Sequence, residues 1–396
     1  LDPLIAASGV KGMNLSVLDV ATGQSLYDRG GDVPNVPAST TKLATAVAVL
    51  STRGPGFRIP TRAVAGNAPG EVVLVGGGDP TLAVGATGSY PGAARLDQLA
   101  QQTRRALGGQ TPTKVTVDAS LFTGPRYEPG WDPGTPTEGY GAAVTALMTD
   151  GARVDPRQAT GPAQRVSEPD LAAGRSFARL LGVPPTTVTQ GTAPAPAASP
   201  AAAGAPGAEL GRVESPPMLR LVEFMLGESD NVVAELLARQ VALARNQPAS
   251  FTGAAAAVDG VLADLGLDAG QSALADGSGL SRSNRITADL LAKLLALAAD
   301  PGHPELAGIA AALPVAAWSG TLRDRYGTAA GGSSAAGVVR AKTGTLSGVH
   351  SLAGMVTTAD GRLLAFAIMA DDVPSTLDVR PRMDRMAAAL GACGCR

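Results

Sequence analysis

The chain has 396 residues, which is enough for two or three domains and a sizeable buried core. Its 32 basic residues against 34 acidic ones give a net charge of -2, which excludes the strongly basic footprint of a nucleic-acid-binding protein. With 45% hydrophobic and 17% charged residues, the composition is that of a globular protein rather than a disordered one.

The sequence carries no signal for a metal site or a membrane span. Its two histidines, His303 and His350, have no partner at metal-ligand spacing, so we expect neither a metal nor another cofactor. Cys393 and Cys395 lie one residue apart, and both a local disulfide and two free thiols stay open. No apolar run reaches the roughly 18 residues of a membrane span, so we expect a soluble chain. Its start at Leu1 rather than Met indicates a processed product.

Alternating apolar and polar residues predict strands at both ends of the chain. Residues 13–27 have the pattern of a hairpin around the ATGQ turn at residues 21–24. Near the other end, an antiparallel meander is predicted from three strand candidates at residues 338–342, 349–356 and 363–370.

Helical periodicity dominates the middle of the chain. The predicted helices are residues 39–50, 218–226, 232–243, 254–265 and 287–299, the last with Thr287 as its cap. We therefore expect an α+β fold in which an antiparallel sheet, built from both chain ends, is flanked by helices from the middle.

Residues 62–211 interrupt this plan. The elements predicted there are a strand at 72–75, a helix at 95–107 and a strand at 114–118. We interpret the interval as one inserted α/β domain, so that residues 1–61 and 212–396 form a discontinuous main domain. The interval ends in a Pro/Ala-rich stretch at residues 192–207, which we expect to be a mobile loop or linker.

A lysine lies where a buried helix is predicted. Lys42 is the only charged residue between Asp32 and Arg53, on a stretch that is apolar on nearly every face. Ser39 precedes it by three residues, so the two side chains share one helical face. A desolvated lysine favours its neutral form and can take a proton from serine, which predicts a nucleophile with its base. Alternatively, Ser39 is an ordinary helix-capping residue.

Two further motifs lie where side chains can face a cleft. The SDN motif at residues 229–231 separates two predicted helices, and helix capping is its alternative interpretation. The KTGT motif at residues 342–345 ends a predicted strand before a tight turn. Its lysine offers a positive charge for a substrate carboxylate, and the strand edge can pair with an extended peptide. The alternative is an exposed cationic strand end.

Together, Ser-x-x-Lys, Ser-x-Asn and Lys-Thr-Gly occur in the order that is typical of penicillin-binding proteins and β-lactamases. The chain resembles the penicillin-recognising active-site serine acyltransferases. More narrowly, it resembles the class C low-molecular-mass penicillin-binding proteins, which are D-alanyl-D-alanine carboxypeptidases and endopeptidases of the DacB type. The segments that carry this narrower resemblance are GGGDPTL (76–82), VDASLFTGPRYEPGW (117–131), ADGSGLSR (275–282), LPVAAWSGTLRDR (313–325) and AKTGTLSGVHSLAGMVTTADGR (341–362).

The resemblance implies a β-lactamase/transpeptidase-like main domain and a serine DD-peptidase activity. Such an enzyme cleaves the terminal D-Ala-D-Ala bond of peptidoglycan stem peptides through an acyl-enzyme, and β-lactam antibiotics inhibit it. The residues that the resemblance assigns are Ser39 as nucleophile, Lys42 as general base, Ser229 as proton relay to the leaving amine, Asn231 as holder of the acyl side chain, and Lys342 with Thr343 as the binding site of the terminal carboxylate.

The resemblance also implies supporting roles. The backbone N–H groups of Ser39 and Thr345 would form the oxyanion hole, and Gly344 allows a close approach of the substrate backbone. Asp150, in the inserted domain, is a candidate for contacting the charged end of the stem-peptide side chain, with a solvated loop aspartate as the alternative. Asp230 has no assigned role.

Two rival functions stay open. One is a β-lactamase or esterase on the same scaffold, which needs an efficient deacylation route. The nearest acids to the SDN motif, Glu228 and Glu235, lie in no identifiable motif, so we predict a long-lived penicilloyl adduct. The other rival is a non-catalytic peptidoglycan-binding or penicillin-sensing protein.

Three other features are interpreted as structural. GGGDP at residues 76–80 lacks the ending of a phosphate loop and predicts a turn. Ser278 has no histidine partner and predicts a structural loop that lines the cleft, and His350 predicts a packed strand residue. Because peptidoglycan lies outside the cytoplasmic membrane, we expect the protein in the periplasm or cell wall space. We also expect it to be a monomer. The motifs do not separate carboxypeptidase from endopeptidase action.

Overall fold

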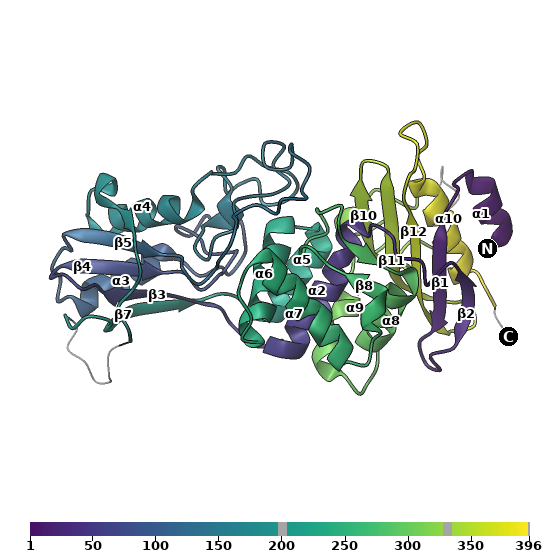
Figure 1. Cartoon of the computed structure of the whole chain (residues 1–396), viewed down its shortest axis with the longest axis horizontal. Helices are drawn as coiled ribbons and strands as arrows, with labels where there is room; N and C mark the ends of the chain where they lie inside the picture. Colours follow the sequence, from purple (N-terminus) through teal and green to yellow (C-terminus); the bar gives the residue numbers. More distant parts are fainter. Residues whose placement is uncertain (197–203, 328–334, 395–396) are drawn as a thin grey trace.

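The computed structural model describes residues 1–196, 204–327 and 335–394. The chain forms two β-sheets with a group of helices between them, and both termini lie at the same end of the molecule (Figure 1). Residues 197–203 of the Pro/Ala-rich stretch and Cys395 lie outside the described residues, so the expectations for that stretch and for the cysteine pair stay predictions.

The first sheet, called the terminal sheet here, takes its strands from both chain ends in the order β10-β11-β12-β1-β2. Its strands are β1 (Asn14–Asp19), β2 (Ser25–Arg29), β10 (Arg340–Leu346), β11 (Val349–Thr357) and β12 (Leu363–Ala370). All neighbours are antiparallel, which confirms the predicted hairpin and meander. One boundary was wrong: β10 does not end at Lys342, because residues 342–346 continue the pairing with residues 349–353.

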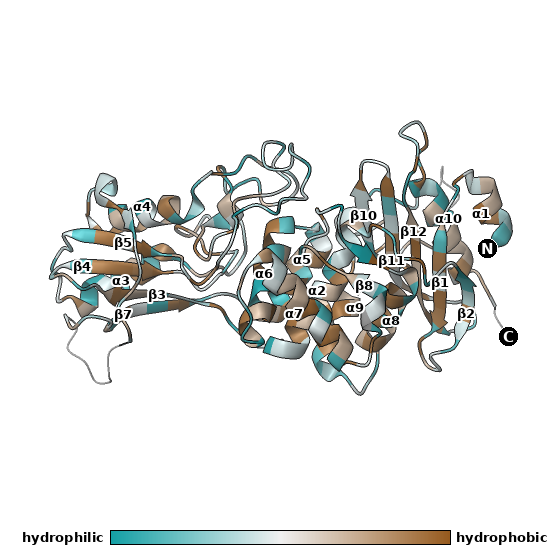
Figure 2. Ribbon diagram, in the orientation of Figure 1, coloured by the Kyte–Doolittle hydropathy of each residue, from teal (hydrophilic) through white to brown (hydrophobic). Residues whose placement is uncertain are grey.

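The terminal sheet is buried on both faces. On β12, Ala365 and Ala367 join one apolar core, whereas Leu364 and Phe366 join the other, which is the period of two expected for a strand. Figure 2 shows β11, β12 and β1 coloured hydrophobic along most of their length. The helices on the outer face are α1 (Asp2–Ser8) and α10 (Arg380–Gly391).

Helices cover the inner face of the terminal sheet. They are α2 (Thr41–Arg53), α5 (Met218–Glu228), α6 (Asn231–Ala244), α7 (Phe251–Asp264), α8 (Ala288–Ala298) and α9 (Gly308–Ala312). Sequence periodicity predicted all but α9, and the Thr287 hydroxyl caps α8 as expected. Helix α2 packs against α5, α6, α7 and α8, and every residue from Thr41 to Leu50 is buried, so the predicted central helix is confirmed. Within the described ranges, no helix is long and apolar enough to cross a membrane.

The second sheet, called the inserted sheet here, has the strand order β6-β5-β4-β3-β7 and its own apolar core. Its elements are β3 (Pro60–Ala65), β4 (Glu71–Val75), β5 (Lys114–Asp118), β6 (Thr189–Gln190), β7 (Glu209–Glu214), α3 (Leu96–Ala106) and α4 (Pro169–Leu181). Strand β3 pairs antiparallel with β4 and β7, whereas β4, β5 and β6 are parallel. Local sequence patterns did not predict β3, β6, β7 or α4. Pro60 and Gly211 weaken the local strand signal, and pairing between distant segments decides the structure there.

A short two-stranded sheet completes the fold. It joins β8 (Ser272–Ala273) to β9 (Arg285–Ile286), and the segment between them carries the DGSG sequence at residues 276–279. This segment lies against the start of α2, because a Cβ at Gly279 would fall 1.8 Å from the carbonyl oxygen of Ala38.

Candidate active site

Ser39 lies in a 3-10 turn, Ala38–Thr40, directly before α2. Two hydroxyls donate to the carbonyl oxygen of Pro37 and fix this turn: that of Thr40 at 2.7 Å and that of Ser351, on β11, at 2.6 Å. Ala38 has a φ of 48°, which is uncommon for a residue with a side chain. The turn holds the Ser39 hydroxyl 2.9 Å from Nζ of Lys42.

The Lys42 amine has three hydrogen-bonding partners. Besides the Ser39 hydroxyl, Nζ donates to Oδ1 of Asn231 at 2.6 Å and to the carbonyl oxygen of Ser278 at 2.6 Å. An amide or carbonyl oxygen only accepts, so these two partners take two hydrogens from Nζ. A neutral amine has two hydrogens and one lone pair. In this neutral form, the two contacts leave the lone pair of Nζ for the Ser39 hydroxyl.

The surroundings of Lys42 favour the neutral amine. Its side chain is fully buried, and burial lowers the pKa of Lys42 from 10.5 to about 8. Three carboxylates oppose this shift: Asp276, Glu235 and Asp230. A useful fraction of Lys42 is therefore a free base close to neutral pH.

The junction between α5 and α6 presents Ser229 and Asn231 to the same space. Ser229 has a left-handed backbone with a φ of 57°. The Asp230 carboxylate caps α6, because its Oδ1 accepts from two backbone N–H groups of the first helical turn at 2.9 and 3.0 Å. Nδ2 of Asn231 donates to the carbonyl oxygen of Tyr140 at 2.9 Å, which turns the amide oxygen toward the lysine amine. Capping and cleft-facing roles thus coexist in this motif.

Asp230 also joins this junction to residues 62–211, which are called the inserted segment here. Its Oδ2 accepts from Arg153 at 2.9 Å and lies 3.9 Å from the Arg165 guanidinium, and all three side chains are more than nine-tenths buried. Burial acts to raise the pKa of Asp230, but the two guanidiniums outweigh it and hold that pKa below its ordinary value. The sequence analysis gave Asp230 no role.

Lys342 lies on β10 with its side chain fully buried. Its Nζ donates to Oγ of Ser229 at 2.8 Å and to the carbonyl oxygen of Thr343 at 2.6 Å. Burial, together with the charge of Lys42, holds the pKa of Lys342 well below its ordinary value. The interpretation as an exposed strand end is therefore wrong, because the strand continues and the amine lies behind Ser229.

Gly344 marks the point where β10 passes the nucleophile. A Cβ at this position would fall 2.7 Å from the carbonyl oxygen of Pro37 and 3.0 Å from the backbone nitrogen of Ser39. Any side chain would thus push the strand away from the serine turn. Glycine is required here by this close approach rather than by a turn.

At the outer edge of β10, the backbone is hydrogen-bonded at the start of the strand, whereas further along its outward N–H groups have no backbone partner among the described residues. The N–H of Ala341 donates outward to the carbonyl oxygen of Pro314 at 3.0 Å. Because backbone directions alternate along a strand, the N–H groups of Thr343 and Thr345 point toward the same edge. Both threonines border the pocket described next.

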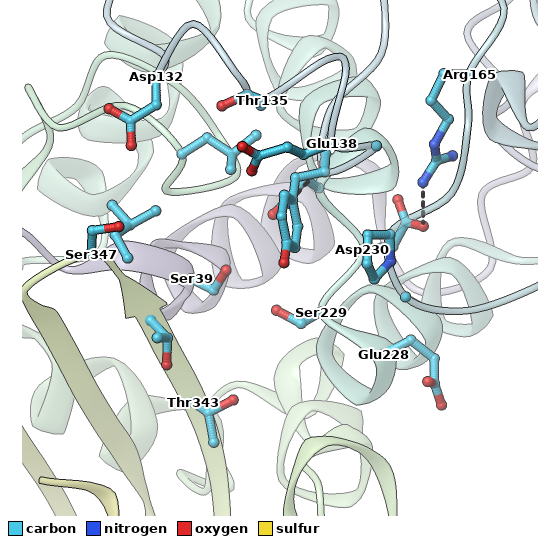
Figure 3. A pocket seen from close by; sticks show the side chains of 18 residues that line it. Ser39, Asp132, Thr135, Glu138, Arg165, Glu228, Ser229, Asp230, Thr343 and Ser347 are labelled. Carbon is cyan, nitrogen blue, oxygen red and sulfur yellow. Dashed lines mark hydrogen bonds and ion pairs between the residues drawn. The ribbon is translucent and has the colours of Figure 1, made fainter. Parts of the chain in front are cut away.

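These groups surround a pocket of about 490 Å³. Figure 3 shows the Ser39 and Ser229 side chains on facing sides of it, with Thr343 below them. Lys42 and Lys342 lie behind these hydroxyls and do not line the pocket. The opposite wall comes from the inserted segment and includes Asp132, Thr135, Glu138, Tyr140, Pro162 and Arg165.

The structure does not bring Asp150 into this pocket. Its Oδ1 accepts from the backbone N–H of Ser89 at 2.7 Å and from the Ser89 hydroxyl at 3.2 Å. The carboxylate borders a separate hollow within the inserted segment. It is only 6% exposed, so it is not a solvated loop aspartate either.

The sequence analysis interpreted three other features as structural: the GGGDP segment, Ser278 and His350. GGGDP forms a turn, in which Oδ1 of Asp79 accepts from the N–H of Thr81 at 2.8 Å, and His350 is a half-buried residue of β11, so both are confirmed. The loop around Ser278 lines the pocket through Leu280, as predicted, whereas Ser278 itself is fully buried behind Lys42. Among the described residues, no cluster of His, Cys, Asp and Glu side chains is arranged to hold a metal ion.

Two residues that shape the site carry no motif of their own: Tyr140 and Glu235. The contact of Tyr140 with Asn231 uses a backbone carbonyl, which sequence cannot reveal. Glu235 was considered only as a deacylating acid. A signal for it existed, because a charged residue on a helix as apolar as α6 is the same anomaly that identified Lys42.

Comparison with known proteins supports the same chemistry. The model of a family described as the D-Ala-D-Ala carboxypeptidase 3 (S13) family matches residues 2–165 and 155–391. A carboxypeptidase of Mycobacterium tuberculosis is 44% identical over 96% of this chain and 80% of the relative. Carboxypeptidase DacB of Mycolicibacterium smegmatis is 40% identical over the same shares. A D-alanyl-D-alanine carboxypeptidase of Actinomadura sp. is 31% identical over 84% of this chain and 73% of the relative.

Among solved structures, penicillin binding protein 4 (dacB) from Haemophilus influenzae has a similar fold. The TM-score is 0.78 over 97% of both chains, with 22% sequence identity. At this identity the likeness concerns the fold alone. The expected α+β class, with an antiparallel sheet flanked by helices, is confirmed.

Proposed function

This chain belongs to the D-Ala-D-Ala carboxypeptidase 3 (S13) family and is a serine-type DD-peptidase, and we propose that Ser39 is its nucleophile and Lys42 its general base. The observation that carries this assignment is the set of partners around the lysine amine. Asn231, Ser278 and Ser39 are its three partners, and when the amine is neutral the first two accept both of its hydrogens and leave its lone pair for the Ser39 hydroxyl. Serine is a weak nucleophile as a free alcohol and needs such a base.

Acylation begins when Lys42 takes the proton from Ser39 and the serine oxygen bonds to the carbonyl carbon of the penultimate D-alanine. The N–H groups of Ser39 and Thr345 stabilise the negative charge that develops on the carbonyl oxygen. The bond from this carbon to the terminal nitrogen then breaks, and the nitrogen takes a proton from Ser229. D-Alanine leaves and Ser39 carries the ester, which water hydrolyses to free the serine.

Ser229 is suited to this proton transfer because it stands between the pocket and Lys342. The Lys342 amine donates to the Ser229 oxygen, which leaves the serine hydrogen free for the leaving nitrogen. The depressed pKa of Lys342 favours the passage of its own proton to Ser229.

The terminal carboxylate of the substrate would bind at the free edge of β10. The Thr343 N–H and the Thr345 hydroxyl are donors there, and Lys342 supplies positive charge from behind. A carboxylate in this position favours the charged form of Lys342. Substrate binding and protonation of Lys342 are therefore coupled. Asn231, which the resemblance assigns to the acyl side chain, first serves to hold the lysine amine.

The proposed substrates are peptidoglycan stem peptides. The family implies action outside the cytoplasm, which for this chain means the periplasm or the cell wall space. A β-lactam carries a reactive amide in place of the D-Ala-D-Ala bond and would acylate Ser39 as well. In support, a solved structure of Haemophilus influenzae penicillin binding protein 4 (dacB) is a complex with a β-lactam.

Slow hydrolysis of the ester that a β-lactam forms on Ser39 would distinguish this enzyme from a β-lactamase or esterase. Within the part of the chain that the structure describes, no carboxylate hydrogen-bonds to the Ser39 hydroxyl. Glu235 is buried behind Lys42 rather than in the pocket, and Glu228 lies beyond Ser229, as Figure 3 shows. Neither acid makes a hydrogen bond with the Ser39 hydroxyl.

We also propose that residues 62–211 form one inserted domain within a main domain of residues 1–61 and 212–396. The separate apolar core of the inserted sheet supports this division. The pairing of β3 with β7 begins at Pro60 and Glu214, so the sheet itself extends slightly beyond the proposed limits.

The test is a time course of intact mass after mixing the protein with benzylpenicillin, alongside Ser39→Ala and with release of D-alanine from a D-Ala-D-Ala peptide measured in parallel. We expect one persistent adduct of the full penicillin mass in the wild type only. D-Alanine release should also disappear in the variant. Equal D-alanine release by the variant would remove Ser39 from the mechanism, and penicillin loss without an adduct would indicate a β-lactamase.

A further inference from the structure

Behind the active site, α6 carries a buried ion pair that the proposed mechanism does not use. Glu235 and Arg239 lie one helical turn apart, with Nη1 of Arg239 3.1 Å from Oε2 of Glu235, and each side chain is 1% exposed. Burying two charges costs more than their attraction usually returns, so such a pair is weak as a device for stability alone. Its contacts indicate another role.

The glutamate holds the DGSG loop. Oε1 of Glu235 accepts from the backbone N–H of Ser278 at 2.9 Å and from that of Gly277 at 3.2 Å. The loop lies very close to the helix, because a Cβ at Gly277 would fall 2.4 Å from the Cβ of Ala238. The carboxylate thus fixes the Ser278 backbone from the side of α6.

The same residue of the loop binds the catalytic lysine on its other side. The carbonyl oxygen of Ser278 accepts from Nζ of Lys42, and this contact is one of the two that direct the amine lone pair at Ser39. The chain of contacts from Glu235 to the nucleophile therefore passes through one residue, Ser278, and one amine.

Arg239 in turn fixes the glutamate. Its guanidinium donates to the Glu235 carboxylate and also to the Glu235 carbonyl oxygen, at 3.0 Å. The guanidinium lies over the ring of Phe251 at 4.1 Å and near that of Phe122 at 5.7 Å, which closes it off from water. Glu235 consequently has little freedom to turn away from the loop.

We propose that the Glu235–Arg239 pair positions the general base: it fixes the DGSG loop so that the Ser278 carbonyl holds one hydrogen of the Lys42 amine and leaves the lone pair to Ser39. Both residues are positioning residues, since neither touches substrate. This inference rests on the function proposed for Lys42.

The pair also contributes to the charge around Lys42. The charged groups that face Lys42 are Asp276, Glu235, Asp230 and Lys342. Burial and the neighbouring charge of Asp276 raise the pKa of Glu235 to about 7, against the opposing effect of Arg239. Glu235 is therefore ionised where Lys42 loses its proton, and its negative charge raises the pKa of Lys42. Removing that charge lowers the pKa of Lys42.

The experiment measures the rate of acylation by benzylpenicillin from about pH 6 to about pH 9 in three variants. In Glu235→Gln the side chain keeps an acceptor oxygen for the loop but loses its charge. We expect its high-pH plateau to stay within about threefold of wild type while the half-maximal pH moves to a lower value. In Glu235→Ala the acceptor is gone, and we expect the plateau to fall by about 10- to 100-fold.

A single variant at Glu235 leaves the buried Arg239 guanidinium without its counter-charge and can fail to fold. The double variant Glu235→Gln/Arg239→Met removes that charge as well and is used in this case. Its glutamine lacks the guanidinium that would fix it, so its plateau should also fall. Asp384→Asn is the control, because it breaks another buried carboxylate–guanidinium pair, with Arg325 at 2.6 Å, on α10. It should lower the melting temperature and leave the pH profile of acylation unchanged.

A folded Glu235→Ala or double variant with the wild-type plateau overturns the proposed positioning role. An unshifted half-maximal pH in folded Glu235→Gln overturns its electrostatic part. Failure of the underlying function looks different, because the wild type itself would then form no adduct on Ser39.

Discussion

At Lys42 the chemistry depends on which atoms the neighbours offer rather than on proximity alone. A lysine beside a serine can as easily donate to it as accept from it. Two carbonyl-type oxygens, from Asn231 and Ser278, accept both hydrogens once the amine is neutral, so that its lone pair is left for the Ser39 hydroxyl. Burial supplies the second requirement, a pKa low enough for the base form to be populated.

Asn231→Asp tests this account of a single residue. A carboxylate in place of the amide would lie about 2.6 Å from the lysine amine and favour its charged form. The pKa of Lys42 should rise by about one unit or more, so acylation by benzylpenicillin should fall at least about tenfold at pH 7 and recover at higher pH. The measurement is the acylation rate as a function of pH.

Asn14→Asp is the matched control, since Asn14 is also a buried amide but is bonded to Asn35 rather than to Lys42. We expect it to reduce stability without moving the pH profile. A profile of Asn231→Asp that coincides with wild type would contradict the assignment of Lys42 as the base.

At the scale of elements, the site depends on how the α5–α6 junction is held. Ser229 and Asn231 face the pocket from a turn whose geometry comes from Asp230, which caps α6 with one carboxylate oxygen and binds Arg153 with the other. One side chain thus fixes the start of a helix and joins it to the inserted segment. This explains why an aspartate lies between the two functional residues.

Asp230→Ala should therefore reduce both stability and activity. The change removes the cap and leaves buried guanidiniums without their counter-charge, so we expect the free energy of unfolding to fall by about 3 to 5 kcal/mol. Acylation should slow because Ser229 and Asn231 are no longer held. Urea unfolding and the adduct time course measure the two effects.

The control for this change is Asp155→Ala, which removes an ion pair with Arg157 in the same inserted segment, 3.0 Å long but open to solvent. Exposed pairs contribute little, so neither measurement should change. If both variants behave alike, the junction does not depend on Asp230.

At the scale of the whole molecule, the inserted segment closes one side of the pocket and is tied to the main body at its rim and at its base. At the rim, Arg282 donates to Asp132 at 3.0 Å and to the carbonyl oxygen of Ser347 at 3.1 Å. At the base, Gln240 on α6 donates to the carbonyl oxygen of Gly77 at 2.8 Å. The GGGDP turn therefore lies where the inserted segment contacts α6 of the main body.

Asp79 in this turn makes the stability of the molecule depend on pH. Its Oδ2 is buried with no hydrogen-bonding partner among the described residues, and burial raises the pKa of Asp79 from 3.8 to about 6. The folded state thus resists ionisation, and the cost is fully present above about pH 6 and absent below about pH 3.8. Asp79→Asn should increase the free energy of unfolding by about 1 to 3 kcal/mol at pH 8, with little gain at pH 4.

Melting temperatures of wild type and variant at the two pH values measure this difference. Asp118→Asn is the control, since Asp118 forms the same kind of turn with Ser120, but its Oδ2 accepts from the N–H of Ala193 at 2.8 Å. An amide there would face another donor, so that variant should lose stability. A gain from Asp79→Asn that is equal at both pH values would exclude ionisation as its cause.

The sequence by itself determined the features that depend on residues close together in the chain. The terminal strands, the main helices, the buried helix with Lys42 and the three motifs all follow from residues within a few positions of one another. Even so, the predicted strand ended too early, at Lys342, because the continuation of β10 through the KTGT motif depends on pairing with β11. Strands β3 and β7, which local composition disfavours, form because they pair across more than a hundred residues of chain.

Only the tertiary structure decided which atoms meet. The contacts of Lys42 with Asn231 and Ser278 join positions 189 and 236 residues apart, and one of them is made by a backbone oxygen that has no sequence signature. The same holds for the ion pairs of Asp230, for the burial of Lys342 behind Ser229, and for the placement of Asp150 in another hollow. Sequence identifies the chemical groups of this enzyme, whereas folding sets their directions and desolvation, on which their reactivity depends.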